Sequence, residues 1–462
     1  MDDKIIKELE DIVGKEWLAT EKEELVCYGY DATPGLFSLS EAIVWPGNTK
    51  EVAQIIQLAN REKIPVYTRG SATGLSGGAV PLKGGIVLCT KRMNRILEFD
   101  SENYTAIVEP GVIVDELNSV ASQFGLIYPP DPGTVATASM GGTVAENSGG
   151  LRGLKYGVTK QYVTGLEVVL ANGEIAQFGG RSVKSVGYDM VMLMTGSEGT
   201  LGVVTKIFVR LVPAPATRKS MIAVFKDLNG AGQSIADIIG NKIIPATLEI
   251  MDNYTIRTVE SFVNLGLPVE AEAIILAEVD GDADTVAYDA KKMEKILRHN
   301  GGEVRVATNA EERDQIWAAR RAALPALAKL RPTIFCEDAT VPRSKIPDMI
   351  RKITQIAQKY DLQIGTFGHA GDGNMHPTIV TDIKDTKEME RVYLAMDEIF
   401  LGALELGGTL SGEHGIGVQK LKYMSAQFGD SGLTVMRSIK QALDPNNILN
   451  PGKLVEISQK VR

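Results

Sequence analysis

The sequence predicts an α+β fold with more than one domain, and three observations support this prediction. A chain of 462 residues is long enough for two or three domains with separate cores. Its first half alternates short Val/Ile-rich segments with clusters of glycine, as strands joined by tight turns do. Beyond Pro213 and Pro215, longer helical patterns alternate with apolar strands. Helices and strands mixed in this way are typical of α+β domains.

The segments follow one another in four parts. Residues 1–35 form a helical lead-in that ends at a turn, and residues 36–213 form the first domain. Residues 214–415 form a second domain, in which we expect an antiparallel sheet with helices on one face. Residues 416–462 are mainly helical. In the first domain we expect strands over 43–45, 86–88, 105–108 and 203–209 and helices over 49–62 and 114–125; in the second, strands over 271–279 and 303–306 on either side of a helix over 283–298.

The composition excludes several classes of function. The formal net charge of −9 argues against a nucleic-acid-binding face. No apolar run reaches the roughly 18–20 residues that cross a bilayer, and the N-terminus lacks the apolar core of a signal peptide, so we expect a cytoplasmic protein without a transmembrane segment. Cys27, Cys89 and Cys336 are too few and too far apart to hold an iron–sulfur cluster. If the function requires an iron–sulfur cluster, another subunit must carry it.

Three glycine-rich clusters lie in the first domain, over residues 67–78, 129–157 and 195–202. Glycine permits positive φ, so consecutive backbone N–H groups can converge on an anion such as a diphosphate. The glycines at 70, 74, 77 and 78 do not follow the G-x-G-x-x-G spacing, which argues against a Rossmann nicotinamide site. Glycine-rich turns between strands are the alternative, but three such loops favour a large flat ligand.

Three of the four histidines lie in two short segments, 368–377 and 411–417. Asp372-Gly373 predicts a two-residue hairpin turn, which would place His369 directly opposite His376. Two such imidazoles can bind one divalent metal ion (Zn, Fe or Mn), with Glu413 as a third ligand. A structural hairpin with surface histidines is the alternative. His414 can reach the same site only if the backbone bends, which Gly412 and Gly415 allow.

Together these motifs and the terminal Asn450-Pro451-Gly452-Lys453 resemble the vanillyl-alcohol-oxidase type flavoproteins. Within them, the histidine motifs are similar to the D-2-hydroxy-acid dehydrogenase branch, which includes D-lactate dehydrogenase, the glycolate oxidase catalytic subunit and D-2-hydroxyglutarate dehydrogenase. The resemblance implies a two-part FAD-binding domain, a ferredoxin-like α+β cap domain over the flavin, and C-terminal helices that return to the FAD domain.

The resemblance also implies the residues that bind the cofactor. Many relatives attach the flavin covalently through a histidine in the first loop, near Thr73 here; the FAD domain has no histidine, so we expect non-covalent FAD. The segment from Arg69 to Gly77 corresponds to the diphosphate loop. The implied FAD-binding residues are Arg69, Gly70, Ser71, Thr73, Gly74, Leu75, Ser76, Gly77, Pro130, Asp131, Gly141, Gly142, Thr143, Ala145, Asn147, Ser148, Gly153, Tyr156, Glu198, Gly202, Val203 and Asn450.

By the same resemblance, His369, His376 and Glu413 are metal ligands, His414 is the general base and Arg320 binds the substrate carboxylate. A guanidinium suits this role because it offers two parallel hydrogen bonds; Arg321 is expected to face solvent. The implied reaction takes a proton from a small D-2-hydroxy acid and passes the C2 hydride to FAD. The apolar run after Arg321, Ala322 to Pro325, favours D-lactate over 2-hydroxyglutarate.

Electrons must then leave the flavin. We expect a partner: electron-transferring flavoprotein first, with an iron–sulfur subunit or quinone as alternatives. Two other functions stay open at this point: a metal-dependent hydrolase that uses the same His/Glu set, and a non-catalytic flavin subunit that only relays electrons.

Overall fold

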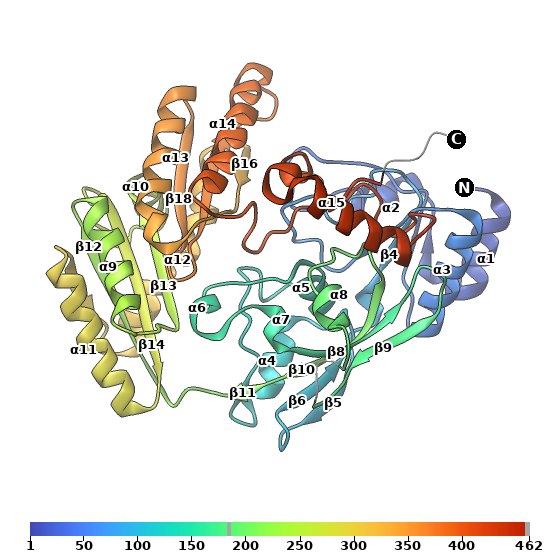
Figure 1. Cartoon of the computed structure of the whole chain (residues 1–462), viewed down its shortest axis with the longest axis horizontal. Helices are drawn as coiled ribbons and strands as arrows, with labels where there is room; N and C mark the ends of the chain where they lie inside the picture. The colour runs from blue at the N-terminus through green and yellow to red at the C-terminus, as the bar shows by residue number, and fades with distance from the viewer. Residues whose placement is uncertain (183–185, 458–462) are drawn as a thin grey trace. The chain divides into compact units, whose positions relative to one another are not determined.

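The computed structural model describes residues 1–182 and 186–457 and forms two compact units (Figure 1). The first unit contains residues 1–149, 158–214 and the chain from 413 onward; the second contains 150–157 and 215–412. The predicted boundaries lay at 213/214 and 415/416, and the predicted lead-in 1–35 is part of the first unit. The inclusion of 150–157 in the second unit was not predicted. Residues 183–185 of the predicted first domain and 458–462 of the predicted C-terminal segment lie outside the described residues.

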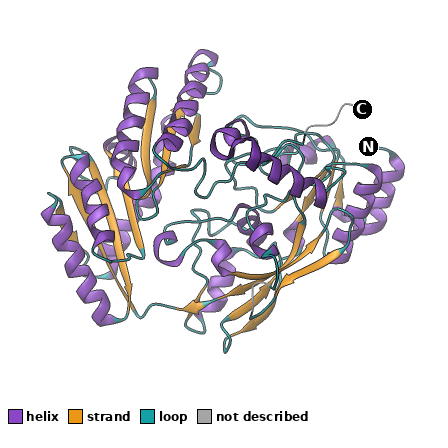
Figure 2. Cartoon of the chain, in the orientation of Figure 1, coloured by secondary structure: helices purple, strands orange, loops and turns teal. Residues whose placement is uncertain are grey.

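The first unit contains two main sheets, as expected for a two-part domain (Figure 2). The order of the first is β1-β2-β4-β3, in which β2, β4 and β3 are parallel. The second has the order β5-β6-β10-β8-β9 and is antiparallel throughout. Their strands are β1 (Leu18–Ala19), β2 (Ala42–Val44), β3 (Val66–Arg69), β4 (Ile86–Cys89), β5 (Ile96–Asp100), β6 (Thr105–Val108), β8 (Val163–Val169), β9 (Ile175–Gly179) and β10 (Val203–Arg210); β7 (Leu126–Ile127) pairs with β11 (Val212–Pro213).

Helix α3 (Thr49–Glu62) illustrates how sequence forms this unit. Its N-terminus is capped by the Asn48 side chain, and its apolar face packs against β2, β4 and α1 (Asp3–Val13) in one core. The prediction of this helix is confirmed, whereas the helix predicted over 114–125 ends at Ser122. The other helices of the unit are α2 (Lys22–Cys27), α4 (Val114–Ser122), α5 (Met140–Glu146), α7 (Thr159–Tyr162), α8 (Met190–Met194) and α15 (Met424–Leu443), with 3-10 turns η1 (Lys15–Trp17), η2 (Thr90–Arg92) and η4 (Leu421–Tyr423).

The second unit is built on one large antiparallel sheet, which confirms the predicted sheet type. Its order is β15-β12-β14-β13-β18-β19-β16, with β17 also paired to β19. Strands β15, β12, β14 and β13 with their connecting helices form the ferredoxin-like part that was expected. The strands are β12 (Thr217–Phe225), β13 (Thr247–Asp252), β14 (Ala273–Gly281), β15 (Glu303–Val306), β16 (Thr333–Cys336), β17 (Ala339–Thr340), β18 (Gln363–His369) and β19 (Asn374–Thr381).

The expectation that helices cover only one face of this sheet is wrong. Ile274 and Leu276 of β14 share a core with Ile316 and Trp317 of α12 and with residues of α10, whereas Phe225 of β12, on the opposite face, lies against α9. The physical reason is that β14 is buried at every position from Ala273 to Asp280, so each of its faces needs a cover. The helices are α6 (Gly153–Tyr156), α9 (Leu228–Gly240), α10 (Asn253–Val263), α11 (Ala283–His299), α12 (Ala310–Leu330), α13 (Ile346–Tyr360) and α14 (Thr386–Glu405), with the 3-10 turn η3 (Arg343–Lys345).

Asp252 joins β13, α10 and β18. One carboxylate oxygen accepts the Thr255 N–H at 2.8 Å and caps α10, and the other accepts the Thr366 N–H of β18 at 2.8 Å. Burial raises the pKa of Asp252 to about 6, although these hydrogen bonds act in the opposite direction.

We predict that Asp252→Asn makes stability less dependent on pH. A carboxyl whose pKa is raised by folding stabilises the fold while it is protonated, and this contribution is lost as pH rises through about 6. Between pH 5 and pH 7 the wild type should lose about 1 kcal/mol relative to the variant, measured by urea denaturation. Asp282→Asn is the control, because Asp282 caps α11 on the surface and its pKa is lowered instead. Equal pH dependence of the wild type and Asp252→Asn would contradict the assignment.

Candidate functional site

The histidine hairpin is formed by β18 and β19, but its register differs from the predicted one. His369 pairs with Asn374 and His376 pairs with Phe367, so the two histidines are diagonal neighbours rather than direct partners. The reason lies in the loop: the N–H groups of Asp372 and Gly373 both donate to the His369 carbonyl, which makes a four-residue connection. Diagonal residues share a face of the sheet, and the two rings still meet, with centroids 5.0 Å apart and planes at 87°.

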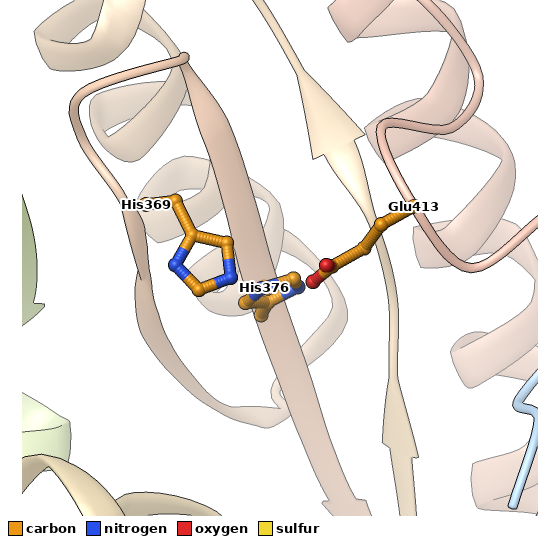
Figure 3. A group of neighbouring side chains, drawn as sticks. All are labelled: His369, His376 and Glu413. Atoms are coloured by element: carbon orange, nitrogen blue, oxygen red, sulfur yellow. The ribbon is translucent and has the colours of Figure 1, made fainter. Parts of the chain in front are cut away.

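His369, His376 and Glu413 form a group with the chemistry of a metal site (Figure 3). One ligand atom from each residue lies within 4.8 Å of the others. Both histidine residues are buried, at 7% and 4% exposure of the whole residue, and Glu413 directly follows Gly412, the last residue of the second unit. Two imidazoles and one carboxylate are a donor set that suits Zn²⁺, Fe²⁺ or Mn²⁺. The residues therefore fit the metal that the sequence predicts.

The segment before Glu413 is fixed by a buried carboxylate. Asp338 is fully buried and accepts the Gly412 N–H at 3.0 Å with each oxygen, while the Ser411 hydroxyl donates to it at 2.5 Å. A Cβ on Gly412 would lie 2.5 Å from Thr340 Oγ1 and 2.7 Å from Asn374 Nδ2. A side chain at position 412 would clash with both groups, so the glycine directly before Glu413 has a steric cause.

The segment after Glu413 bends as the sequence predicts. His414 Nε2 lies 4.0 Å from Glu413 Oε1, so the two neighbours do not point in opposite directions as they would in a strand. Gly415 has φ +81 and Gly417 has φ +52. The N–H groups of Ile416 and Gly417 then donate to the two oxygens of Glu198, each at 2.7 Å. Glu198, predicted as an FAD-binding residue, thus holds the His414 loop.

Glu198 belongs to a buried group of charges in the first unit. Burial, followed by the charge of Glu198, raises the pKa of Glu146 well above its ordinary value, and burial also raises the pKa of Glu198. Burial lowers the pKa of Lys453 to about 8, and its ammonium donates to the carbonyls of Gly77 and Val80. Burial and mutual repulsion disfavour two neighbouring ionised carboxylates, so the protonated form of Glu146 is favoured beside Glu198, which accepts the two N–H groups of the His414 loop.

Arg320 lies on α12, on the face of the sheet that carries His369. Its Nε donates to Glu249 Oε2 at 2.6 Å, and its guanidinium carbon lies 4.7 Å from the centre of the Phe367 ring. Arg321 is exposed and its Nη2 lies 3.4 Å from the Asp314 carbonyl, as expected for a solvent-facing residue. The structure therefore separates the two arginines as the sequence predicts.

Glu249 is the residue that sequence reasoning missed. Its carboxylate is fully buried and lies 2.7 Å from His369 Nδ1 through Oε1, while Oε2 accepts from Arg320. The sequence feature that could have identified Glu249 is its place between the apolar residues Leu248 and Ile250, in what proves to be the buried strand β13. A buried carboxylate in such a strand needs partners, and both partners are candidate site residues.

The predicted diphosphate loop has the donors that an anion requires. Among the described residues, none of the N–H groups from 71 to 78 donates a hydrogen bond within the chain. A Cβ on Gly70 would lie 2.1 Å from Ser139 Oγ, so the loop can approach α5 only with glycine there. Arg69 itself is largely buried, and its Nη1 donates to the carbonyls of Tyr28 and Tyr30.

The other predicted FAD-binding residues fall in two groups. Tyr156 and Gly153 belong to the second unit, where the Tyr156 hydroxyl donates to Asp280 at 2.8 Å. Asn450 Nδ2 donates to the carbonyls of Glu198 and Gly78, and its Oδ1 is a buried acceptor without a partner among residues 1–182 and 186–457. The rest lie in the first unit, in the segment between β7 and α5, in or directly after α5, or at the start of β10: Pro130, Asp131, Gly141, Gly142, Thr143, Ala145, Asn147, Ser148, Gly202 and Val203.

Comparison with known proteins places this geometry in a family. Residues 214–454 match the model of the C-terminal domain of FAD linked oxidases, and residues 40–179 match the FAD binding domain model. A glycolate oxidase subunit GlcD of Bacillus subtilis (strain 168) is 50% identical over 92% of this chain and 91% of its own. A D-lactate dehydrogenase of Anaerostipes hadrus is 36% identical over 94% of this chain and 91% of its own. The prediction of an FAD-binding chain is confirmed.

Solved structures agree on the fold. The chain resembles p-cresol methylhydroxylase with a TM-score of 0.82 at 18% identity, covering 99% of this chain and 98% of that one. It resembles the 4-ethylphenol oxidase of Gulosibacter chungangensis with a TM-score of 0.82 at 20% identity, covering 100% and 98%. Over the described residues, no helix combines the length and the apolar character that a membrane crossing needs.

We predict that Gly415→Ala destabilises the chain more than Gly125→Ala does. Both glycines have positive φ, so alanine costs about 1 kcal/mol of backbone strain at either position. A Cβ on Gly415 would lie 2.2 Å from Glu146 Oε2 and 3.0 Å from Glu198 Oε1, whereas one on Gly125 meets nothing within 4 Å. The clash should add about 1–3 kcal/mol, visible as a lower melting temperature. Equal melting temperatures of the two variants would contradict the packing of the His414 loop.

Proposed function

We propose that this chain, which belongs to the FAD-linked oxidases, oxidises a small D-2-hydroxy acid, D-lactate first, to the 2-oxo acid. The observation that carries this proposal is the Glu249 bridge, which connects a candidate metal ligand, His369, with a candidate carboxylate-binding residue, Arg320. A 2-hydroxy acid presents a hydroxyl and a carboxylate on adjacent carbons, which are the two groups that such a pair of sites would bind.

Arg320 would bind the substrate carboxylate. Among the described residues, Glu249 is the only hydrogen-bond acceptor for Arg320 and it uses Nε, so both terminal nitrogens of the guanidinium can form two parallel hydrogen bonds to a carboxylate. The Phe367 ring beneath the guanidinium restricts its orientation. Binding by a fixed arginine orients the substrate before the reaction, which lowers the entropic part of the barrier.

His414 would act as the general base. When bound, FAD accepts the two electrons and a divalent ion on His369, His376 and Glu413 lowers the pKa of the substrate hydroxyl. The imidazole of His414, beside Glu413, would take the hydroxyl proton while the C2 hydrogen leaves with its electron pair and the C2–O bond becomes a carbonyl. Glu198 would keep His414 in place through the N–H groups of Ile416 and Gly417.

The size of the substrate is suggested by α12. The four residues directly after Arg321 on this helix, Ala322 to Pro325, are apolar, and Ala322 and Ala323 are buried in the core. They offer no partner for the second carboxylate of 2-hydroxyglutarate, which favours lactate or glycolate. Glycolate is the second candidate, because a relative at 50% identity is named a glycolate oxidase subunit.

A partner would receive the electrons. The three cysteines are all free and too few for an iron–sulfur cluster, so onward transfer needs another protein or a quinone. Electron-transferring flavoprotein is our first candidate and an iron–sulfur subunit the second. The relative at 50% identity is named as a subunit, which supports the proposal that this chain also works in a complex. The complete His/His/Glu/His set argues against a purely electron-relaying role.

We predict that D-lactate bleaches the oxidised flavin band of the purified protein under anaerobic conditions, and that L-lactate and D-2-hydroxyglutarate do so far more slowly. Glycolate tests the second candidate in the same titration. His414→Asn should retain flavin but slow its reduction by about 10²- to 10⁴-fold, because a positioned base contributes this much. His299→Asn, at the end of α11, is the control and should behave as the wild type. Rapid full reduction of His414→Asn would overturn the role of His414, and a colourless protein would overturn the proposed function.

A further inference from the structure

The Glu249 carboxylate has two charged or chargeable partners and no exposure to solvent. Oε1 lies 2.7 Å from His369 Nδ1 and Oε2 lies 2.6 Å from Arg320 Nε. The side chain is 0% exposed, and the side chains of His369 and Arg320 are only 9% and 11% exposed. The two contacts stabilise the buried carboxylate, and the carboxylate in turn fixes the positions of the His369 and Arg320 side chains.

Sheet register places these groups together. Glu249 of β13 is the direct cross-strand partner of His369 of β18, and two residues further along the same face Met251 is the partner of Phe367. Glu249, Phe367 and His369 therefore lie on the face of the sheet that α12 covers, where Arg320 stacks on Phe367. The bridge is set by strand pairing and helix packing, not by a flexible surface contact.

The hydrogen bond at Nδ1 determines which nitrogen of His369 is available. A carboxylate can only accept, so Nδ1 must carry the proton, and Nε2 keeps its lone pair for a metal ion. A second hydrogen bond of this kind also fixes the plane of the ring. His376 has a different and longer contact, 3.3 Å from Nδ1 to the Glu337 carbonyl. Glu249 is thus the carboxylate that orients the imidazole of His369, one of the two candidate histidine ligands.

We propose that Glu249 is a positioning residue that couples metal binding at His369 to carboxylate binding at Arg320. This inference rests on the proposed function. Neither the substrate nor the metal ion touches Glu249; it acts through the two side chains that do. Loss of one of its two acceptor oxygens should therefore weaken the binding of at least one of two different ligands, a divalent cation at His369 or an organic carboxylate at Arg320.

Glu249→Gln is the sharpest test, because the amide keeps the shape of the side chain but has one acceptor and one donor. If the amide oxygen stays with Arg320, its NH₂ faces His369 Nδ1 and drives the proton to Nε2, where it blocks the metal ion. If the amide oxygen stays with His369, its NH₂ faces the Arg320 Nε–H and displaces the guanidinium. Either arrangement breaks one arm of the bridge.

Glu278→Gln is the matched control. Glu278 is a buried carboxylate on the neighbouring strand β14, on the same face of the sheet, and it accepts from Trp317 Nε1 and Ser220 Oγ. Trp317 precedes Arg320 by one turn of α12. The control therefore makes the same chemical change beside the same helix without touching His369 or Arg320.

The measurements are the dissociation constant for Zn²⁺, from competition with a chromophoric chelator, and the KM and kcat for D-lactate or glycolate, all on flavin-loaded protein. We expect Glu249→Gln to weaken Zn²⁺ binding about 10- to 100-fold or to raise KM by a similar factor, with Glu278→Gln within twofold of the wild type. Zn²⁺ affinity and KM that both equal those of the control would overturn the proposal.

A second variant keeps the proposal testable if Glu249→Gln does not retain flavin. Glu249→Asp keeps the charge and both acceptors but is one methylene too short to reach both partners, so it should show the same losses to a smaller extent. Wild-type values for Glu249→Asp would overturn the proposal.

A wild-type chain that binds no divalent ion overturns both this proposal and the metal part of the proposed function. A wild type that binds Zn²⁺ and oxidises substrate, with Glu249 variants equal to the control, overturns only this one.

Discussion

The candidate site depends on one constraint: charged groups that are buried on a sheet face must be paired with one another. Glu249 meets this constraint for His369 and for Arg320 at once, with both of its oxygens in use. Removing one partner of such a buried set leaves an uncompensated charge, which costs several kcal/mol. Moving either of the side chains that would bind ligands would therefore destabilise the second unit. A geometry that the fold itself fixes is the condition for efficient orientation of a substrate.

Buried carboxylates also accept hydrogen bonds from the backbone on either side of Glu413. Asp338 accepts the Gly412 N–H in the second unit, and Glu198 accepts the Ile416 and Gly417 N–H groups in the first. Buried carboxylates thus hold the six-residue stretch from Gly412 to Gly417 that carries Glu413 and His414, and glycines make the close approach possible. A loop that would otherwise be mobile is given fixed positions for a candidate ligand and a candidate base.

The sequence predicted the parts of the fold that depend on local pattern. Helix α3 and strand β15 begin and end where the apolar periodicity and the caps place them, and the His/His/Glu group was found from three residues in two glycine-rich segments. The hairpin register was missed because the Asp372 and Gly373 N–H groups turn back to the His369 carbonyl, which no dipeptide signal specifies. Glu249 was missed because its partners are 71 and 120 residues away. Contacts of that separation follow from sheet order and helix packing, and neither can be read from a single strand.

X-ray absorption spectroscopy of the flavin-loaded protein with bound Zn²⁺ tests the central claim most directly. The account predicts two imidazole nitrogens at about 2.0–2.1 Å and at least one carboxylate oxygen at about 2.0–2.2 Å around the ion. The scattering of one imidazole should disappear in His369→Ala, while its flavin content stays unchanged. A wild-type spectrum with oxygen ligands alone, or one that His369→Ala leaves unaltered, would contradict the claim that this sheet face is built to hold a metal ion.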